Sequence, residues 1–307
     1  MIIEFSKELE KQDFYANGKE LASIMGLDKD EAGKRVYEYP DDKRVHVATL
    51  EKPVLVTDIY RITQLEPTQR DTVFKLFESS VRHTIYDGVS IDFEQEKYPG
   101  VWGPSIDTVA FCLGLSRLDL SKIKNAIEIG AGSGFISKYL LEKLPNLKSM
   151  DLVDLNQRAE ECWKDNINDP RAHFYIEDGA LYMESRKTDL LICNPPYIPR
   201  PRSIDDNAYE GIGLMRFLIS GAKKTLSDSG ILVINYSSLS EKEAMEAISE
   251  SGMTMETLVK MEVPLKVCNV LNNSEWVNYL LQRGMQSKNQ NGYQYWHNIF
   301  IVALRRT

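Results

Sequence analysis

The segment Asn194-Pro195-Pro196-Tyr197 has the residue types and spacing best suited to chemistry in this sequence. It directly follows an apolar run, and two consecutive prolines end a strand because they cannot donate to its ladder and they fix the backbone. The Asn194 side-chain oxygen and the Pro195 carbonyl can then be held as two acceptors that face one NH2 group. Tyr197 can stack on the flat group that carries this nitrogen. The segment therefore predicts a clamp that aligns a planar nitrogen for attack on an electrophilic carbon, without a metal.

A glycine-rich turn supplies a second group of candidate residues, Gly130, Gly132 and Gly134. Glycines let the chain turn sharply after a strand and let its backbone approach a ligand closely. Their spacing is G-x-G-x-G, and Phe135 occupies the place of the third glycine of the dinucleotide motif, so an NAD-dependent oxidoreductase is disfavoured. Glu128, just before the turn, would repel a pyrophosphate, whereas it suits the cationic amino-acid end of a ligand.

Three further carboxylates complete the candidate site. Asp154 ends a predicted strand roughly 20 residues after the glycine turn, where nucleoside-binding units hold both ribose hydroxyls with a carboxylate. Asp178 follows the next predicted strand and can accept a hydrogen bond from an adenine amino group, and an Asx-type turn is the alternative. Asp107 begins a predicted helix within the segment 101–108, which either covers the ligand or serves as a linker and helix cap.

Strand-like and helix-like patterns alternate strictly after residue 125. This alternation predicts an α/β fold with a doubly wound, mostly parallel sheet of seven strands and helices on both faces. In such a sheet the ligand binds at the carboxyl ends of the strands, near the topological switch point. The predicted strands cover 126–130, 150–155, 172–177, 189–194, 230–237, 254–263 and 298–304, and the predicted helices cover 107–115, a stretch ending near 144, 157–167, 210–226 and 240–251.

The chain divides near residue 100, where proline, glycine and aromatic residues cluster. Residues 1–97 predict a small N-terminal α+β accessory domain, and substrate recognition is one hypothesis for its role. Residues 98–307 form the predicted α/β domain, with an insertion at about 264–297 that either covers a substrate or is a surface elaboration. Within the accessory domain the patterns predict helices over 19–25, 29–37 and 67–84 and strands over 44–50 and 53–59.

Composition is that of a globular protein. The chain has 307 residues, of which 43% are hydrophobic and 27% are charged. No apolar run approaches the ~20 residues of a membrane span, and the first residues lack the apolar core of a signal peptide, so we expect a cytoplasmic protein that does not enter membranes. The four cysteines and four histidines are scattered, which disfavours a disulfide frame or a metal site. The net charge of −8 disfavours nucleic acid as a substrate without excluding it.

Taken together, these motifs resemble the class I S-adenosylmethionine-dependent methyltransferases of the small-domain branch. The E-x-G-x-G-x-G turn, the VDLN acid, the P-S-x-D-T box and the strand followed by NPPYIP carry the resemblance, and NPPYIP is most similar to the HemK family. That family methylates the side-chain amide nitrogen of glutamine in peptide-chain release factors. The resemblance implies a Rossmann-like fold and S-adenosylmethionine as cofactor, with Asn194 to Tyr197 holding the acceptor amide. The cofactor contacts that it implies come from Asp107, Glu128, Gly130, Gly132, Gly134, Asp154 and Asp178.

The methyl acceptor stays open between two main hypotheses. The first is a glutamine-type side-chain amide of a protein partner. The alternative is the N6 nitrogen of adenine in RNA or DNA, because methyltransferases of that class carry a similar NPPY loop and must unstack the base. In that case Arg200 and Arg202, just after the loop, could contact a phosphate. A third hypothesis, a scaffold that binds the cofactor without turnover, is disfavoured by the intact loop, and the sequence indicates no oligomeric state.

Overall fold

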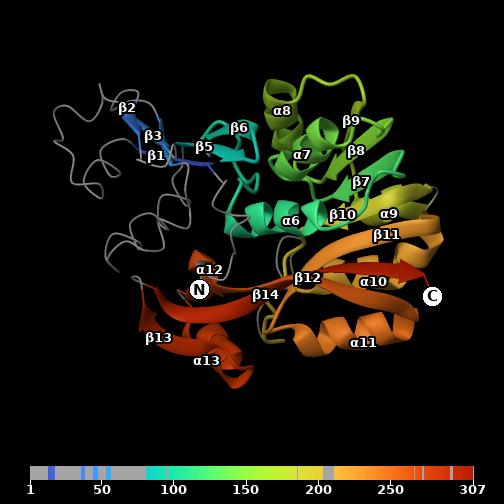
Figure 1. Cartoon of the computed structure of the whole chain (residues 1–307). Helices are drawn as coiled ribbons and strands as arrows, with labels where there is room; N and C mark the ends of the chain where they lie inside the picture. The colour runs from blue at the N-terminus through green and yellow to red at the C-terminus, as the bar shows by residue number, and fades with distance from the viewer. Residues whose placement is uncertain are drawn as a thin grey trace.

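A sheet of eight strands forms the centre of the C-terminal part of this computed structural model (Figure 1). The structure describes residues 13–17, 36–38, 44–47, 53–56, 81–94, 96–184, 186–202, 211–265, 267–271, 273–290 and 293–306. Seven strands of this sheet are neighbours in the order β9-β8-β7-β10-β11-β14-β12, and β13 pairs with β14 beside them. The strands are β7 (Asn125–Ile129), β8 (Ser149–Asp154), β9 (Ala172–Ile176), β10 (Thr188–Cys193), β11 (Leu226–Ser237), β12 (Met253–Pro264), β13 (Gln286–Gln290) and β14 (Tyr293–Arg306).

The strand directions confirm a doubly wound sheet. Strands β9, β8, β7, β10 and β11 are parallel, whereas β14 is antiparallel to both β11 and β12. The chain proceeds outward from β7 through β8 to β9 and then returns to β10 on the other side of β7. The switch point of the topology therefore lies between β7 and β10, and their carboxyl ends are where such a sheet binds its ligand.

Helices cover both faces of the sheet, as the alternation predicts (Figure 1). One face carries α6 (Ile106–Ser116), α7 (Phe135–Lys143) and α8 (Gln157–Asn166), whose buried side chains share one core with the strands. The opposite face carries α9 (Gly179–Glu184), α10 (Gly213–Thr225) and α11 (Glu241–Ser251) over a second core. Two more helices, α12 (Cys268–Leu271) and α13 (Ser274–Gln282), belong to the predicted insertion and contribute to a third core.

Strand β10 shows why the NPPY loop (Asn194–Tyr197), which the sequence predicts to be the acceptor loop, begins where it does. Leu190, Leu191, Ile192 and Cys193 are all fully buried, as expected for a parallel strand covered on both faces. The strand ends at Cys193, directly before the two prolines, so the apolar run brings the NPPY segment to the switch point.

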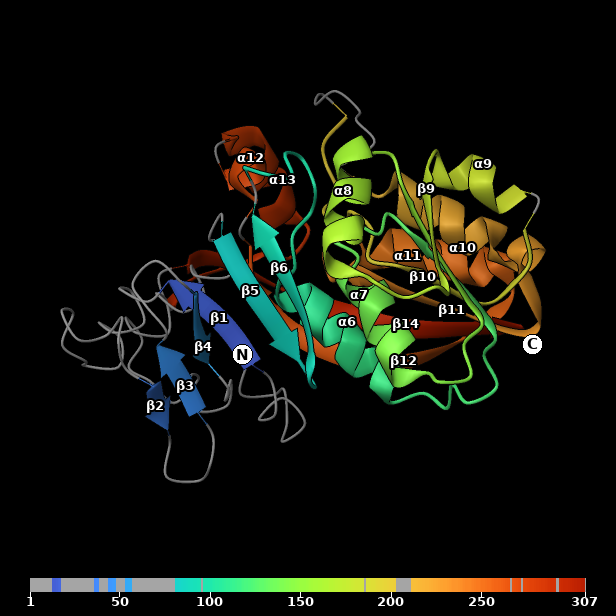
Figure 2. The same cartoon turned by 90° about the horizontal axis from the view of Figure 1, so that it is seen from above.

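A second sheet precedes the main one, in the order β2-β3-β4-β1-β5-β6, with every pair antiparallel. Its last strand lies beside α7 and α8 (Figure 2), where Asp92 N donates to Asn166 Oδ1 at 2.8 Å and Asn166 Nδ2 donates to Asp92 O at 2.9 Å. The domain boundary after residue 97 therefore stays a prediction. The strands are β1 (Asp13–Asn17), β2 (Val36–Glu38), β3 (Arg44–Val47), β4 (Pro53–Val56), β5 (Val81–Tyr86) and β6 (Val89–Glu94).

Several predicted boundaries are wrong. The helix expected over 67–84 is contradicted at residues 81–84, which begin β5, and the helix expected over 29–37 is contradicted at Val36 and Tyr37, which lie in β2. In both places pairing with a neighbouring strand overrides the local helical spacing. The helix expected over 19–25 and residues 67–80 lie outside the described residues. Strand β11 begins at Leu226, four residues before the predicted 230, and the short α9 was not predicted.

No helix in the described part of the chain is both long and apolar enough to cross a membrane. Within the same residues, no group of three or more His, Cys, Asp or Glu side chains could hold a metal ion. Cys112, Cys162 and Cys193 are buried free thiols, which agrees with their interpretation as small apolar residues.

The packing of α6 on the sheet gives a stability prediction. A Cβ atom at Gly114 would lie 2.7 Å from Ile301 Cγ2 in the fully buried part of β14. We expect Gly114→Ala to lower the free energy of unfolding by about 1–3 kcal/mol, because α6 must move off the sheet. Gly221→Ala is the matched control, since its nearest foreign atom is 3.8 Å away and alanine should add about 0.5–1 kcal/mol in a helix. Urea denaturation measures both, and equal stabilisation of the two variants would contradict the close contact.

Candidate active site

The glycine turn after β7 has backbone angles that favour glycine. Gly130, Gly132 and Gly134 have φ values of 68°, 50° and 77°, in the left-handed region. A Cβ atom at Gly132 would lie 2.8 Å from the carbonyl oxygen of Trp102, and Ser133 N donates to that same oxygen at 2.9 Å. The turn therefore packs directly against the segment 101–108, which the sequence left open between covering the ligand and serving as a linker and helix cap.

Asp154 lies at the tip of β8, next to the turn. Its Oδ2 accepts from Gly132 N at 2.8 Å, and its Oδ1 accepts from Asn156 N at 2.9 Å. Burial raises the pKa of Asp154, and the hydrogen bonds from the backbone of Asn156 and Gly132 oppose that shift. A carboxylate has about four acceptor positions, so capacity for further donors remains on both oxygens.

Glu128 is a buried carboxylate that faces a cavity. It is 1% exposed, and burial raises its pKa to about 8, although the hydrogen bond from the Ser137 hydroxyl opposes this shift. No cationic side chain pairs with it within the described part of the chain. A carboxylate buried in this way is stabilised by an incoming positive charge, so the residue fits the cationic end of an amino-acid-like ligand.

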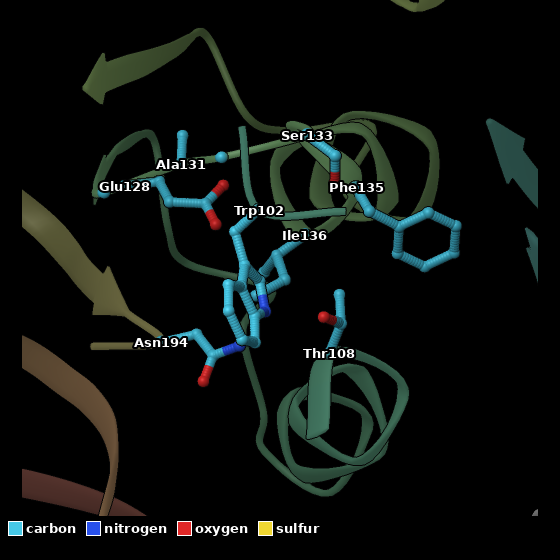
Figure 3. Close-up of a pocket in the computed structure, with 10 residues that line it drawn as sticks. Trp102, Thr108, Glu128, Ala131, Ser133, Phe135, Ile136 and Asn194 are labelled. Carbon is cyan, nitrogen blue, oxygen red and sulfur yellow. The ribbon is translucent and has the colours of Figure 1, made fainter. Parts of the chain in front are cut away.

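The cavity itself lies at the switch point between β7 and β10 (Figure 3). The Glu128 carboxylate, the Trp102 indole and the Asn194 amide all border it, and Trp102 remains 60% exposed. The glycine turn and Thr108 of α6 complete much of its wall. The structure thus brings together the first strand end, the segment 101–108 and the NPPY loop, as the sequence predicts.

Asp107 connects two of these parts. It is 5% exposed, and its Oδ2 accepts from Asn194 Nδ2 and from the Tyr197 hydroxyl, each at 3.3 Å. Its Oδ1 accepts from the hydroxyl of Ser105, the residue that precedes α6. The side chain was expected to close over a cofactor, and the structure places it against the acceptor loop.

Asp178 differs from the other predicted carboxylates because its side chain is exposed. Its Oδ1 accepts from Ala180 N at 2.7 Å, which is the Asx-type turn that the sequence offered as the alternative. This bond caps α9 and leaves the other oxygen available, so a contact with adenine stays a prediction.

The insertion and the residue before α11 both bind backbone carbonyls of the NPPY loop and of the residues that follow it. Trp276 Nε1 of α13 donates to Pro199 O at 2.8 Å, and Ser240 Oγ donates to Tyr197 O at 2.9 Å. Around the first of these bonds, Ile198 joins a buried cluster whose other members include Leu239, Leu265, Val270, Trp276, Val277, Leu280 and Met285. The insertion therefore forms a core with the loop, and whether it also covers a substrate stays a prediction.

Sequence reasoning missed two buried polar residues beside the loop. Asn235 of β11 is fully buried, and its Nδ2 donates to Asn194 Oδ1 at 2.7 Å. His297 of β14 is 3% exposed, its Nδ1 lies 2.9 Å from Ser237 Oγ, and its ring centroid lies 6.0 Å from that of Tyr197. The sequence did carry a signal for Asn235, because this asparagine follows the apolar run ILVI within a predicted strand.

Comparison with known proteins identifies the family. Residues 97–262, more than half of the chain, match the family model described as the methyltransferase small domain. The chain belongs to this family. It is an S-adenosylmethionine-dependent methyltransferase, and relatives that share the family's activity support an enzyme over a non-catalytic scaffold.

The relatives are of modest identity. One from Methanocaldococcus jannaschii, named "putative protein N5-glutamine methyltransferase", is 29% identical over 187 residues, which are 57% of this chain and 92% of that protein. The release factor glutamine methyltransferase of Moorella thermoacetica is 29% identical over 190 residues, covering 56% of this chain and 62% of that protein. The tRNA1(Val) (adenine(37)-N6)-methyltransferase of Proteus mirabilis is 23% identical over 154 residues, covering 47% of this chain and 61% of that protein. The last two matches span less than two thirds of the relative.

Among solved structures, the precorrin-6y C5,15-methyltransferase of Geobacter metallireducens is similar with a TM-score of 0.43 and 15% sequence identity. The similarity covers 66% of this methyltransferase and 91% of that chain.

The raised pKa of Glu128 predicts how stability depends on pH. The folded protein holds this proton up to a pKa of about 8, whereas the unfolded chain releases it near the ordinary value of 4.5. Between these values the folded state binds more protons, so this group makes the free energy of unfolding fall as pH rises. Glutamine does not titrate, so the free energy of unfolding of Glu128→Gln lacks this fall with pH. The difference between the variant and wild type should therefore shift in favour of the variant by on the order of 1–4 kcal/mol from pH 5 to pH 8.

Urea denaturation of the ligand-free protein at several pH values measures this difference. Asp178→Asn, which removes an exposed carboxylate by the same exchange of acid for amide, is the control. Parallel profiles for wild type and Glu128→Gln would show that Glu128 does not hold the proton.

Proposed function

We propose that this methyltransferase transfers the methyl group to the side-chain amide nitrogen of a glutamine in a protein partner of the release-factor kind. The observation that carries the proposal is the fixed orientation of the Asn194 amide. Its Nδ2 donates to Asp107 and its Oδ1 accepts from Asn235, so both ends of this amide are held at the wall of the cavity. An amide oxygen has two lone pairs, so on this proposal an acceptor NH2 group donates to the one that Asn235 leaves free.

On this proposal the clamp acts by alignment. The carbonyl of Pro195 is the second acceptor for the NH2 group, and the Tyr197 ring bears on the planar group that carries it. Tyr197 is held for this by its hydroxyl bond to Asp107 and by the nearby His297 ring. Hydrogen bonds to both N–H groups favour the positive charge that develops on nitrogen, and the nitrogen can lose its proton after transfer.

The cofactor supplies an electrophilic methyl group bound to a sulfonium. Glu128 would accept the cationic methionyl end, because it is a buried carboxylate at the cavity wall without a cationic partner in the described residues. Asp154 would accept the ribose hydroxyls on the oxygens that Gly132 N and Asn156 N already orient. Charge-assisted hydrogen bonds of this kind are the stronger ones.

Glutamine as the acceptor group is supported by the relatives from Methanocaldococcus jannaschii and Moorella thermoacetica, whose names state that chemistry. The net charge of −8 agrees with a protein partner. Adenine N6 is the second candidate, because the relative from Proteus mirabilis acts on adenine and because Arg202 is exposed just after the loop.

A labelling experiment separates the two acceptors. Methyl transfer from radiolabelled S-adenosylmethionine into cell extract is followed by protease or nuclease treatment. Label lost with protease supports a protein acceptor, which a glutamine-containing peptide then tests directly. Label lost with nuclease, together with a transfer rate that falls steeply with added salt, would replace glutamine by adenine.

For the clamp, we predict that Asn194→Ala lowers the rate of methyl transfer at least ~100-fold, because charge stabilisation in the transition state is lost. Affinity for S-adenosylhomocysteine should stay within a few-fold of wild type. Tyr197→Phe is the matched control: it removes the bond to Asp107 and keeps the ring, so most of the rate should remain. Transfer that survives in Asn194→Ala would show that the clamp model is wrong.

For the cofactor contacts, we predict that Asp154→Ala weakens S-adenosylhomocysteine binding by about 1.5–3 kcal/mol, the value of hydrogen bonds to a charged group. Isothermal titration calorimetry measures this loss. Asp154→Asn keeps an acceptor for Gly132 N, so the turn should keep its shape. Its affinity for S-adenosylhomocysteine should still be lower than that of wild type, because the carboxylate that would bind the ribose is gone. Unchanged affinity in both variants would remove Asp154 from the cofactor site.

A further inference from the structure

Asn235 is a polar residue in an apolar environment. It is fully buried near the end of β11, and Val233 and Ile231, two and four residues before it on the same face of the strand, belong to the core beneath α6. The parallel register pairs Cys193 of β10 with Ile234 of β11, so the next residues, Asn194 and Asn235, are neighbours across the two strands. An apolar side chain at this place would continue the core.

The orientation of the two amides follows from one carboxylate. Asp107 can only accept, so the Asn194 atom that faces it must be Nδ2, and Asn194 Oδ1 is turned toward Asn235. For the same reason the Asn235 atom that faces Asn194 Oδ1 must be its donor, Nδ2. Asp107 therefore fixes the donor and acceptor ends of both amides. The orientation of the Asn194 amide depends on a partner at each of its two ends.

This arrangement has a cost. Asn235 Oδ1 is buried and accepts no hydrogen bond from the described residues. A buried acceptor without a donor loses the hydrogen bonds that it makes with water in the unfolded chain. Leucine at this position would avoid that loss, so stability alone does not explain the asparagine.

We propose that Asn235 is a positioning residue for methyl transfer, which fixes Asn194 Oδ1 as the acceptor for the substrate N–H. The inference rests on the proposed role of Asn194 in the clamp. The bond from Asn235 Nδ2 prevents rotation of the Asn194 amide about its last side-chain torsion. It occupies one lone pair of Oδ1 and leaves the second for the substrate N–H. Asn235 itself is too deeply buried to contact the substrate.

The first test reads the Asn194 side chain without turnover. In 15N-labelled protein bound to S-adenosylhomocysteine, hydrogen exchange of the Asn194 Nδ2 protons is measured by NMR in wild type and in Asn235→Leu. Loss of the partner of Oδ1 should let the amide rotate, so exchange should become at least tenfold faster. The melting temperature should be unchanged or higher, because the unpaired acceptor is gone. An exchange rate equal to that of wild type would overturn the proposal.

The second test uses a donor that can be titrated. Asn235→Asp has nearly the same shape, and burial should raise the pKa of the new carboxyl group into the working range. Its protonated form can donate to Asn194 Oδ1, and its ionised form cannot. The ratio of its kcat to that of wild type should therefore fall at least tenfold from pH 6 to pH 9, whereas the ratio for Asn235→Leu should be low at every pH.

Ratios to wild type are needed because other titratable groups lie nearby. Asp107 of α6, Tyr197 of the loop, Glu128 of β7 and His297 of β14 surround the amide pair, and all are present in each variant. In both variants the KM for S-adenosylmethionine should stay within twofold of wild type. A residue with a merely structural role would lower the melting temperature and leave the pH profile of kcat unchanged.

The two tests fail separately. Activity is measured with a glutamine-containing peptide and with a single-stranded adenine oligonucleotide, and the variants are compared on whichever one the wild type methylates. If the wild type methylates neither substrate, the proposed function fails. Hydrogen exchange of the Asn194 amide still tests whether Asn235 holds it, because that measurement needs no turnover. If Asn235→Leu keeps kcat within threefold of wild type, the positioning role is wrong whatever the acceptor is.

Discussion

The carboxylate of Asp107 accepts hydrogen bonds from Ser105, Asn194 and Tyr197, and the rest of the site depends on this convergence. It is held at the first turn of α6, and α6 in turn packs on β14 through the close contact between Gly114 and Ile301. A shift of α6 would therefore release the acceptor loop from its only carboxylate partner among the described residues. Because a carboxylate cannot donate, the same contact decides that the Nδ2 end of the Asn194 amide faces Asp107 and the Oδ1 end faces Asn235.

The acceptor loop is supported from three directions. Its two prolines restrict the backbone, Ser240 directly before α11 donates to the Tyr197 carbonyl, and Trp276 of α13 donates to the Pro199 carbonyl. Such an aligned geometry is what a transfer reaction without covalent participation of the protein requires, since the rate then depends on the orientation of the two reacting groups. The insertion that carries Trp276 thus holds the segment that follows the NPPY motif.

The two carboxylates on the cofactor side differ in their partners. Glu128 is buried with one hydroxyl donor and has a pKa raised to about 8, whereas Asp154 accepts two backbone N–H groups that oppose the same effect of burial. On the proposed function, the first would be stabilised by a positive charge and the second would orient neutral hydroxyls. The proposal thus assigns each carboxylate to one of the two chemically distinct parts of S-adenosylmethionine.

The sequence by itself determined the doubly wound sheet, the strand ends that carry Glu128, Asp154 and Asn194, and the turn in which glycine is needed. These features follow from local rules: apolar runs form buried strands, glycine accepts left-handed backbone angles, and two prolines end a strand. Only the tertiary structure decided that residues 81–84 form a strand and that Asp107 binds the acceptor loop. It also decided that Asn235 and α13 support the loop. The contacts of Asp107, Asn235 and α13 join residues that are distant in sequence, and their free energy depends on which elements become neighbours, which no local pattern encodes.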